Sequence, residues 1–516
     1  MGRYPLGDSQ LQGILIEAIM KKPFVFYTAL VIVVLQTPVV FCFQADLKQS
    51  QVNNDLVVFI KDHLGKSSYG NYMGGKKVGW DTDEIKFAKL NGVEVVSQVS
   101  ESYFKALFGG NKTEVSERTE VFYSLAGKGD IILINSFHLE NGVKKTRELS
   151  LQKSGFTLVT TTQNRKDEKK VSKPKENLSM QLELASWLKS KRIKGDTFDC
   201  FSTSVEEDDL NVPTRYIYKG KKNIQAQGAN LMLHEVDQET HGALFYSLLE
   251  NNGRLYYGRM GKIIEYRLES NDVAKKLDDS LVDLIQISAV TLDKKLGDPV
   301  KVKSLKLSFV GEDAFDVPQS HRQIISKGKD GSLVMEIKRD FVLKTSVPLL
   351  LDEKKRSLAP SISTPSDNPK VVGLAIKIVG DASSDFEKAS RLVKWIFANL
   401  EKTMAKNSDN ALDVLDKKAG DCTEHTLLFV TLARALGIPA REVGGIAYMA
   451  GEKSPKMGWH AWAEFHDGKQ WITADPTWNQ ILVDGTHIKF SEGSTDLKWL
   501  NILGGLTLKV IDFQKD

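Results

Sequence analysis

The stretch GDCTEHTLL, residues 420–428, decides the fold of the last third of the chain, because it opens a helix with a cysteine in the first turn. Asp421 is the predicted N-cap, and Glu424, three residues later, completes a capping box. The residues that follow, 427–436, lack glycine and proline and are apolar on nearly all sides, which predicts a buried central helix. At the helix start, unpaired backbone N–H groups and the helix dipole favour a thiolate at Cys422.

A hairpin further along the chain supplies a base for this thiol. Residues 459–478 read WHAWAEFHDGKQWITADPTW, in which Asp467 and Gly468 form a predicted two-residue turn between two alternating runs. With that turn, His460 lies directly opposite Asp475, and cross-strand partners have Cβ atoms about 4.5–5.5 Å apart. The carboxylate would then fix the imidazole tautomer and leave the other ring nitrogen for the thiol.

Together these residues make a candidate catalytic triad. We expect Cys422 to be the nucleophile, His460 the general base and then acid, and Asp475 the group that orients the imidazole. The Cys422 backbone N–H is a predicted oxyanion donor, and an indole would supply the second donor or line the substrate groove. The candidates for that indole are Trp478, Trp459 and Trp462. The candidates for a capping or supporting role around the thiol are Asp421, Glu424 and His425.

Each member of the triad also has a structural interpretation. A single buried cysteine is commonly a small apolar residue of the core, and a strand histidine paired with an aspartate can be structural. Asp475 precedes Pro476 and could simply begin a turn. Cys422, His425, His460 and Asp475 could also ligate a metal ion. The helix-start thiol and the hairpin together favour the triad, so we expect neither a metal nor a cofactor.

Length and composition indicate a multidomain globular protein. The 516 residues are too many for one ordinary core and suggest two to four domains. The net charge is only +4 and the lysines are scattered, which argues against nucleic-acid binding. The three cysteines, Cys42, Cys200 and Cys422, are too few for a disulfide framework and have no zinc-finger spacing. The residues around Cys200 assign it no role.

An apolar segment near the N-terminus predicts export. Lys21 and Lys22 precede a nearly uninterrupted apolar run over residues 24–43, which is the layout of a secretory signal or a single membrane anchor. We assign residues 1–45 to this segment, with Met20 as an alternative start. If the segment is retained, residues 24–43 associate with the membrane. A buried core strand is the remaining alternative.

The rest of the chain divides into a β-rich part and a more helical part. Residues 46–275 alternate in polarity with frequent turn signals, and residues 281–350 form a smaller set of strands typical of a β-sandwich-like domain. Residues 351–369, which include a stretch rich in serine and proline, are a predicted linker. Residues 370–516 begin with helical periodicity and contain the triad. The predicted fold is multidomain, with antiparallel all-β regions followed by an α+β domain.

Four segments carry more specific predictions. Residues 69–80, YGNYMGGKKVGW, predict two strands around a Gly-Gly-Lys turn. Residues 176–189 have apolar residues at helical spacing and predict a helix. The charge run at 165–175 predicts an exposed loop, and residues 284–290 predict a strand.

Four short motifs together resemble one enzyme family. GDCTEH at residues 420–425 is followed by LGIPAR at 436–441, WHAW at 459–462 and DPTW at 475–478. This order resembles the transglutaminase-like superfamily, whose core is papain-like. The pattern is similar to exported bacterial members with β-rich N-terminal regions, and the likeness is specific over about residues 370–490.

The resemblance implies a fold, a site and a class of reaction. It implies an α+β core in which the cysteine helix packs against an antiparallel sheet, and it maps Cys422, His460 and Asp475 onto the family's nucleophile, base and orienting carboxylate. Active members form an acyl-thioester from a carboxamide, as transglutaminases, amidases or cysteine proteases. The implied partner is a protein or peptide substrate, and the implied location is the bacterial periplasm, cell envelope or extracellular space. The acyl acceptor, water or an amine, stays open.

A second class of function also stays open from the sequence. Some members of the family have lost activity, and about three hundred β-rich residues precede the core in this chain. The alternative is a non-catalytic cell-envelope binding or assembly protein with a vestigial transglutaminase-like core.

Overall fold

The computed structural model describes residues 51–516 except for short stretches. Those outside the description are residues 109, 163–164, 206–209, 227–228, 280, 310–316, 329–331, 404–407, 409, 452–453 and 494–495. The predicted signal or anchor at 1–45 also lies outside the described residues. Within the part that is described, no helix is long and apolar enough to cross a membrane.

The described chain forms two compact units. We call residues 51–106 together with 112–282 the N-terminal unit, and residues 107–111 together with 283–516 the C-terminal unit. Residues 283–350 of the predicted small β domain, the predicted linker at 351–369 and residues 370–516 all fall within the C-terminal unit.

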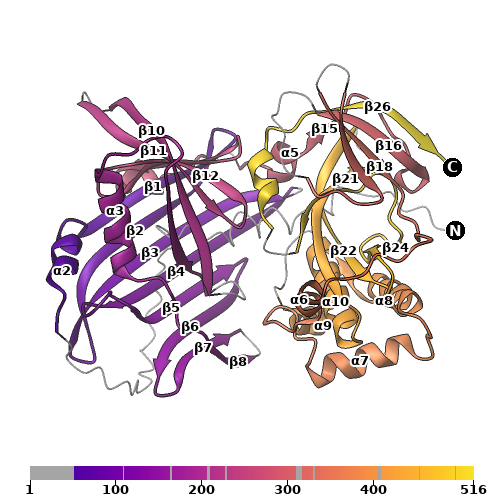
Figure 1. The fold of residues 1–516 in the computed structure, drawn as a ribbon, viewed down its shortest axis with the longest axis horizontal. Helices are drawn as coiled ribbons and strands as arrows, with labels where there is room; N and C mark the ends of the chain where they lie inside the picture. Colours follow the sequence, from indigo (N-terminus) through magenta and orange to yellow (C-terminus); the bar gives the residue numbers. More distant parts are fainter. Residues whose placement is uncertain are drawn as a thin grey trace. The chain divides into compact units, whose positions relative to one another are not determined.

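The N-terminal unit is built on one antiparallel sheet of 14 strands, in the order β8-β7-β6-β5-β4-β3-β2-β1-β14-β13-β12-β11-β10-β9 (Figure 1). The strands are β1 (Gly65–Met73), β2 (Lys76–Leu90), β3 (Val93–Phe108), β4 (Asn111–Ser124), β5 (Ile131–Glu140), β6 (Val143–Gln152), β7 (Gly155–Thr161), β8 (Lys166–Val171), β9 (Thr197–Thr203), β10 (Asn211–Ala226), β11 (Ala229–Thr240), β12 (Ala243–Leu249), β13 (Leu255–Met260) and β14 (Ile264–Glu269). Apart from β1 and β14, strands adjacent in the sheet are also consecutive in the chain. The sheet is therefore assembled mostly from local pairings.

The first of these pairings confirms the hairpin predicted at residues 69–80. β1 and β2 pair as far as Met73 with Lys76, and the two turn residues, Gly74 and Gly75, have φ of +55° and +80°. Positive φ at both central positions is the type I′ turn, whose twist matches that of the paired strands. Side chains with a Cβ avoid this conformation, so the two glycines determine the turn.

Three helices belong to the N-terminal unit, namely α2 (Asn54–Lys61), α3 (Leu178–Lys189) and α4 (Asn271–Lys275). α3 confirms the helix predicted over 176–189, and the side chain of its N-cap, Asn177, accepts a hydrogen bond from the Met180 amide. The prediction of a loop at 165–175 was wrong for residues 166–171, because the segment KDEKKV forms β8 at the edge of the sheet, whereas residues 172–175 lack regular structure. Charged side chains on an edge strand oppose pairing with other chains. That position explains the charge run.

The C-terminal unit contains a six-stranded sheet in the order β24-β23-β22-β21-β25, with β15 also paired to β22. Its strands are β15 (Val290–Thr291), β21 (Ala440–Met449), β22 (Lys456–His466), β23 (Trp471–Asp475), β24 (Gln480–Ile481) and β25 (Ile488–Glu492). Two short strands, β19 (Glu401–Lys402) and β20 (Ala419–Gly420), pair in parallel just before the cysteine helix.

The described helices of this unit include the predicted cysteine helix, α10. They are α5 (Leu284–Ser288), α6 (Leu351–Leu358), α7 (Pro369–Val379), α8 (Asp385–Asn399), α9 (Ala411–Lys417) and α10 (Cys422–Ala435), with 3₁₀ turns η1 (Pro299–Lys301) and η2 (Lys498–Ile502). α10 packs against β22 on one side and against α7, α8 and α9 on the others (Figure 1). Phe429 of α10 and Phe465 of β22 are fully buried neighbours in this core. The predicted buried central helix is confirmed.

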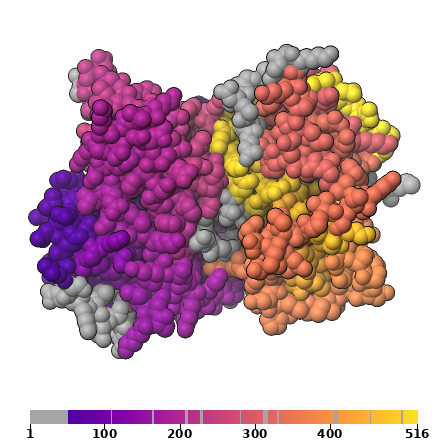
Figure 2. All heavy atoms as spheres, in the orientation of Figure 1, coloured from indigo at the N-terminus to yellow at the C-terminus, as the bar shows by residue number. Residues whose placement is uncertain are grey.

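A second sheet in the C-terminal unit has four strands in the order β17-β18-β16-β26. Its strands are β16 (Val302–Phe309), β17 (Gln323–Lys327), β18 (Leu333–Lys338) and β26 (Leu508–Lys515). The sequence predicts a small sandwich over 281–350, whereas these strands form one sheet that the end of the chain completes. Figure 2 shows the yellow C-terminal residues among the side chains of this sheet.

Two further predictions from the sequence are corrected by the structure. Residues 284–290 begin as the helix α5 rather than a strand, because the Asp283 side chain accepts hydrogen bonds from the amides of Ile285 and Gln286 and caps a helical turn. The predicted linker at 351–369 begins as the helix α6, so only its second half lacks regular structure.

Candidate active site

The start of α10 has the predicted capping box. The Thr423 amide donates to Oδ1 of Asp421 (2.7 Å), and the Asp421 amide donates to Oε2 of Glu424 (2.9 Å). These bonds satisfy backbone donors that would otherwise be left open in the first helical turn. The cap holds Cys422 at the first position of the helix, with its side chain fully buried.

Burial makes the thiol of Cys422 harder to ionise than the sequence suggests. Burial raises the pKa of this thiol well above its ordinary value, and the charges of Asp421 and Asp475 act in the same direction. A hydrogen bond from the backbone N–H of Ala461 to the thiol acts in the opposite direction. The helix start was expected to favour a thiolate, whereas burial opposes ionisation of this thiol. A thiolate at this position needs a base that takes the proton.

The hairpin that carries His460 and Asp475 forms, but its register differs from the prediction. The last pair is His466 with Trp471, so four residues, 467–470, connect the strands instead of two. Continued by one pair, this register places Trp462, rather than His460, opposite Asp475. Because Trp462 and His460 are two residues apart on one strand, His460 and Asp475 stay on the same face of the sheet. The two side chains therefore meet diagonally rather than as direct cross-strand partners.

The longer turn has a local cause in Asp467. Its Oδ1 atom accepts hydrogen bonds from the amides of Lys469 (2.8 Å) and Gln470 (2.9 Å). An aspartate that bonds the backbone two and three residues ahead stabilises a turn of this length. Asp467 and Gly468 signal a hairpin correctly, but the aspartate side chain selects the four-residue turn.

His460 and Asp475 form a fully buried pair. Nε2 of His460 lies 3.0 Å from Oδ2 of Asp475, and neither side chain is exposed. Oδ1 of the same carboxylate accepts from the amides of Thr477 (2.8 Å) and Trp478 (3.2 Å), which fixes its orientation. An ionised carboxylate accepts hydrogen bonds only, so Nε2 of His460 carries the proton and Nδ1 has the lone pair.

The remaining ring nitrogen of His460 is the one needed for a thiol. Nδ1 is buried and has no hydrogen-bond partner among the described residues. The next residue on the strand, Ala461, is the one whose amide contacts Cys422. Burial lowers the pKa of His460, although the charge of Asp475 opposes this. The neutral imidazole is therefore the resting form, as a general base requires.

The three candidate tryptophans occupy different positions. The Trp478 ring stacks on His460 with ring centroids 4.0 Å apart and planes 12° apart. The Trp459 indole N–H donates to the Ser288 carbonyl (3.0 Å), so we do not retain Trp459 as an oxyanion donor. The Trp462 indole N–H is buried and has no partner in the described part of the chain. Trp462 thus keeps an available donor, while Trp478 covers one face of the base.

His425 lies one turn after the thiol and supports the helix start. Its Nδ1 donates to the Asp421 carbonyl (2.7 Å), and burial lowers the pKa of its ring. Its Nε2 is buried with no partner among the residues described. The structure therefore places His425 beside the thiol, outside the hydrogen-bonded pair of His460 and Asp475.

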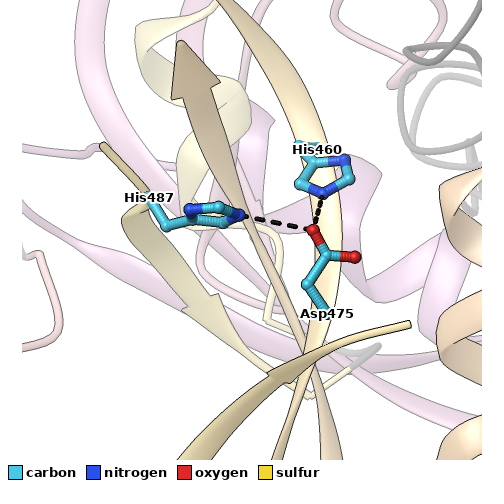
Figure 3. A group of neighbouring side chains, drawn as sticks. All are labelled: His460, Asp475 and His487. Atoms are coloured by element: carbon cyan, nitrogen blue, oxygen red, sulfur yellow. Dashed lines mark hydrogen bonds and ion pairs between the residues drawn. The ribbon is translucent and has the colours of Figure 1, made fainter. Parts of the chain in front are cut away.

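The structure adds two residues that the sequence analysis missed, His487 and Asp484. Nε2 of His487 lies 3.4 Å from Oδ2 of Asp475 (Figure 3). Its Nδ1 lies 3.2 Å from Oδ1 of Asp484. All three side chains are buried. His487 immediately precedes β25, which reaches β21 by a pairing that no short-range pattern reveals. The sequence DGTH at 484–487 is the only local signal, and it indicates a turn.

A glycine on β21 allows β25 to approach this closely. A Cβ on Gly445 would lie 2.0 Å from the Ile488 carbonyl oxygen and 2.7 Å from the Trp462 ring. Backbone at that distance cannot accommodate a side chain, so any other residue would push β25 away. Gly445 therefore helps to hold His487 beside Asp475.

These groups also form a candidate metal-binding set. One ligand atom each from His460, Asp475 and His487 lies within 4.8 Å of the others. Both imidazoles, however, already face the carboxylate of Asp475 at hydrogen-bond distance. The alternative set considered from the sequence, with Cys422 and His425, is not the group that the described residues form. We therefore assign the group as a hydrogen-bonded network.

With this geometry established, the chain can be compared with known proteins. Residues 372–476 match the family model of the transglutaminase-like superfamily. This segment is a transglutaminase-like domain. It contains Cys422, His460 and Asp475, and with the β-rich remainder it confirms the predicted fold class.

Individual relatives match only parts of the chain. An uncharacterized protein of Haemophilus influenzae is 31% identical over 123 residues, which are 19% of this chain and 33% of the relative. A protein-glutamine gamma-glutamyltransferase of Pseudomonas aeruginosa is 35% identical over 92 residues, 16% of this chain and 14% of the relative. The crystal structure of the periplasmic domain of TgpA from Pseudomonas aeruginosa covers 35% of this chain and 88% of that domain, at 16% identity and a TM-score of 0.25. The chain thus spans a third or less of the length of these curated relatives.

Proposed function

We propose that the C-terminal unit is a thiol-dependent enzyme that acts on carboxamide bonds of proteins or peptides through an acyl-thioester on Cys422. The observation that supports this most is the buried pair of His460 and Asp475, which leaves Nδ1 of the imidazole without a partner. The family relationship of residues 372–476 supports a cysteine-based enzyme of this general kind.

In the first step, the sulfur of Cys422 attacks the carbonyl carbon of a carboxamide. Nδ1 of His460 takes the thiol proton as the S–C bond forms, and the imidazolium is stabilised by Asp475. The same proton then passes to the amide nitrogen, the C–N bond breaks, and ammonia or an amine leaves. The raised pKa of the thiol makes this transfer to His460 necessary, because little free thiolate exists at neutral pH.

In the second step, an acceptor resolves the thioester. Water gives a carboxylic acid, and a primary amine gives a new amide. His460 removes a proton from the acceptor and returns one to the sulfur, which restores the resting enzyme. In both steps a negative charge develops on the carbonyl oxygen, and we assign the Cys422 backbone N–H and the Trp462 indole N–H as its candidate donors.

The site is closed in this structure. The side chains of Cys422, His460 and Asp475 have no exposed surface, and the half-buried Trp478 ring covers the imidazole. A water-excluding site strengthens the interactions between the charges inside it. A peptide substrate therefore reaches the thiol only after groups such as Trp478 move, and a substrate with a flexible side-chain carboxamide fits this requirement better than a rigid backbone amide.

We further propose that the protein is exported. Lys21 and Lys22 followed by the apolar run at 24–43 support this location. Fusion of residues 1–45 to a reporter that is active only outside the cytoplasm tests the proposal. Reporter activity supports export, and activity confined to a cytoplasmic reporter contradicts it.

The enzymatic proposal is tested with the full chain, a glutamine-containing peptide and a labelled primary amine. We expect release of ammonia together with either a deamidated peptide or an amine-labelled peptide, which identifies the acceptor. Cys422→Ala should abolish both products. The matched control is Cys200→Ala, which removes the half-buried thiol of β9 and should leave the rate unchanged.

Two outcomes would contradict the proposal. One is product formation that persists in Cys422→Ala. The other is absence of reaction with a panel of peptides, together with a specific peptide complex that is equally strong in the wild type and in Cys422→Ala. The second result would favour the binding function considered from the sequence.

A further inference from the structure

Four buried side chains form a continuous series next to the proposed nucleophile. His460 contacts Asp475 at 3.0 Å, Asp475 contacts His487 at 3.4 Å, and His487 contacts Asp484 at 3.2 Å. Figure 3 shows that both imidazoles point at the same carboxylate oxygen of Asp475. A triad needs only the first of these contacts, so His487 and Asp484 require a separate explanation.

Both carboxylates in the series are held as acceptors. Oδ1 of Asp484 accepts from the amide (2.9 Å) and hydroxyl (2.6 Å) of Thr486, and its Oδ2 accepts from Nε2 of Gln480 (2.9 Å). The Oδ1 atom of Asp475 accepts from two backbone amides, as described above. With donors directed at every oxygen, each carboxylate is ionised.

This arrangement determines the protonation of His487. Each of its ring nitrogens faces a carboxylate oxygen, and a neutral imidazole has a donor on one nitrogen only. The neutral form would direct a lone pair at a negative charge, whereas the imidazolium donates to both Asp475 and Asp484. Burial lowers the pKa of His487, but the charges of the two aspartates outweigh it and the pKa is raised.

The other groups around His487 do not replace this charge. The Arg322 guanidinium donates to the backbone carbonyls of His487 and Asp484, both at 3.0 Å, and does not contact either carboxylate. Trp462 and Trp478 lie edge-on to the His487 ring, each with ring centroids 5.2 Å apart. His460, on β22, has its ring centroid 5.7 Å away. Lys489, two residues further along β25, pairs instead with Glu464 and Glu492.

We propose that His487 is a positioning residue of this site, held as a cation between Asp475 and Asp484 and sharing Oδ2 of Asp475 with His460. The shared oxygen is pulled toward two N–H donors, so Asp475 stabilises a proton on His460 less than it would alone. His487 thereby keeps His460 neutral at rest, with the Nδ1 lone pair ready for the Cys422 thiol. The charge of His487 indeed acts to lower the pKa of His460.

The first experiment measures protonation without activity. Full-length protein with ¹⁵N-labelled histidine is studied by long-range ¹H–¹⁵N NMR, with His487→Gln used to assign the signal. We expect both nitrogens of His487 to be protonated at pH 8. His138 of the N-terminal unit is an internal reference, because it lies between Glu117 and Glu140 and its pKa is raised to about 9. A neutral His487 at pH 8 would overturn the proposal.

The second experiment rests on the proposed function and measures the pH dependence of kcat/KM. The fall of kcat/KM at low pH, the acid limb of the profile, reports protonation of His460. His487→Gln should move this limb to higher pH by about 0.5–1 unit, because Asp475 then acts on His460 alone. Asp484→Asn leaves the imidazole in place and removes its supporting charge, but the charge of Asp484 itself raises the pKa of His460, so the limb should move in the same direction by less than in His487→Gln. His138→Gln is the matched control and should not change the profile.

The outcomes separate this proposal from the proposed function. A lower rate with an unchanged acid limb in both His487→Gln and Asp484→Asn would show a purely structural role and overturn the proposal. If the wild-type chain processes no carboxamide, the proposed function fails, and the NMR experiment still decides the charge of His487. The pKa of His460 measured in the same spectra should rise in both variants.

Discussion

Three buried carboxylic acids of the N-terminal unit differ from two buried carboxylic acids on the catalytic sheet of the C-terminal unit. In the N-terminal unit, burial raises the pKa of Asp81, Asp83 and Glu176 to about 7. In the C-terminal unit, burial acts the same way on Asp484 and Glu464, yet their pKa is lowered to about 2.

The partners of these groups explain the difference. Asp83 is hydrogen-bonded by Ser100 and Gln98, which are neutral, so desolvation dominates. Glu464 faces Lys489 and Arg441, and their positive charges outweigh the same desolvation. Burial alone therefore does not create a charged site. The sheet of the C-terminal unit keeps Asp484 and Glu464 ionised because it places an imidazole or cations against them, whereas burial and the neighbouring Glu424 raise the pKa of Asp421 at the start of α10 well above its ordinary value.

The largest effect is expected when Asp475→Asn is compared with Asp83→Asn. Asp475→Asn should lower kcat/KM by about 10³–10⁴-fold, because the amide cannot orient and stabilise the imidazolium of His460. Asp83→Asn replaces a group in the N-terminal unit, outside the triad, whose pKa of about 7 leaves it only partly ionised at pH 7, so activity should change by less than about twofold. The measurement is the steady-state rate with a carboxamide peptide at pH 7. Comparable losses in both variants would contradict the distinction.

A second test concerns buried cations. Lys489→Met leaves Glu464 buried with one of its two cationic partners removed, and should lower the free energy of unfolding by about 3 kcal/mol. Lys66→Met removes a partly exposed partner of Glu101 in the N-terminal unit and should cost at most about 1 kcal/mol. Urea denaturation of each variant measures both values. The double variant Lys489→Met with Glu464→Gln should recover part of the loss, and no recovery would argue against a charge effect.

The two sets of buried carboxyls compared above should make stability depend on pH with opposite signs. Carboxyls with a raised pKa stabilise the N-terminal unit below the unfolded pKa of about 4, and this stability is lost as the pH rises toward 7. Carboxylates with a lowered pKa stabilise the C-terminal unit above about pH 4, and this stability is lost as the pH falls toward 2. From pH 5 to pH 8 the N-terminal unit should therefore lose on the order of 1 kcal/mol or more.

Hydrogen exchange resolved by peptide and corrected for intrinsic rates measures this difference. Amides in β2 and β3 should exchange faster at pH 8 than at pH 5 after correction. Amides in β22 and β23 should not become faster for this reason. Equal responses in both units would contradict the assignment of the buried carboxyls.

The smallest effects should come from exposed ion pairs, in which the two units should not differ. Arg215 and Asp199 pair on the surface of the N-terminal unit (2.7 Å), and Lys370 and Asp416 pair on the surface of the C-terminal unit. Replacing either basic residue by alanine should leave the unfolding temperature essentially unchanged, because solvent screens both pairs. Thermal unfolding measures both. A larger loss in either unit would show that surface pairs also carry the contrast.

The same two regions show how far sequence can predict this structure. The N-terminal sheet consists mostly of consecutive hairpins, and turns such as Gly74-Gly75 are determined by a few adjacent residues. The cysteine helix could also be predicted, because Asp421 and Glu424 form its cap within four residues of Cys422. Local chemistry of this kind can be recognised in one chain.

Features that depend on distant pairing could not be predicted in the same way. The face shared by His460 and Asp475 was correct although the register was not, because an error of two residues preserves strand alternation. His487 reaches Asp475 through the pairing of β25 with β21, and nothing near residue 487 indicates that partner. β26 pairs with β16 across some two hundred residues of sequence, and the periodicity of neither segment indicates this pairing.

The most direct test of the account is the mass of the acid-quenched full-length protein after mixing with a glutamine-containing peptide. The account predicts a transient adduct equal to the peptide minus ammonia, located on Cys422 and released by hydroxylamine. His460→Gln should prevent its formation, while Cys200→Ala should not. An adduct on another residue, or unchanged formation in His460→Gln, would contradict the proposed roles of Cys422 and His460.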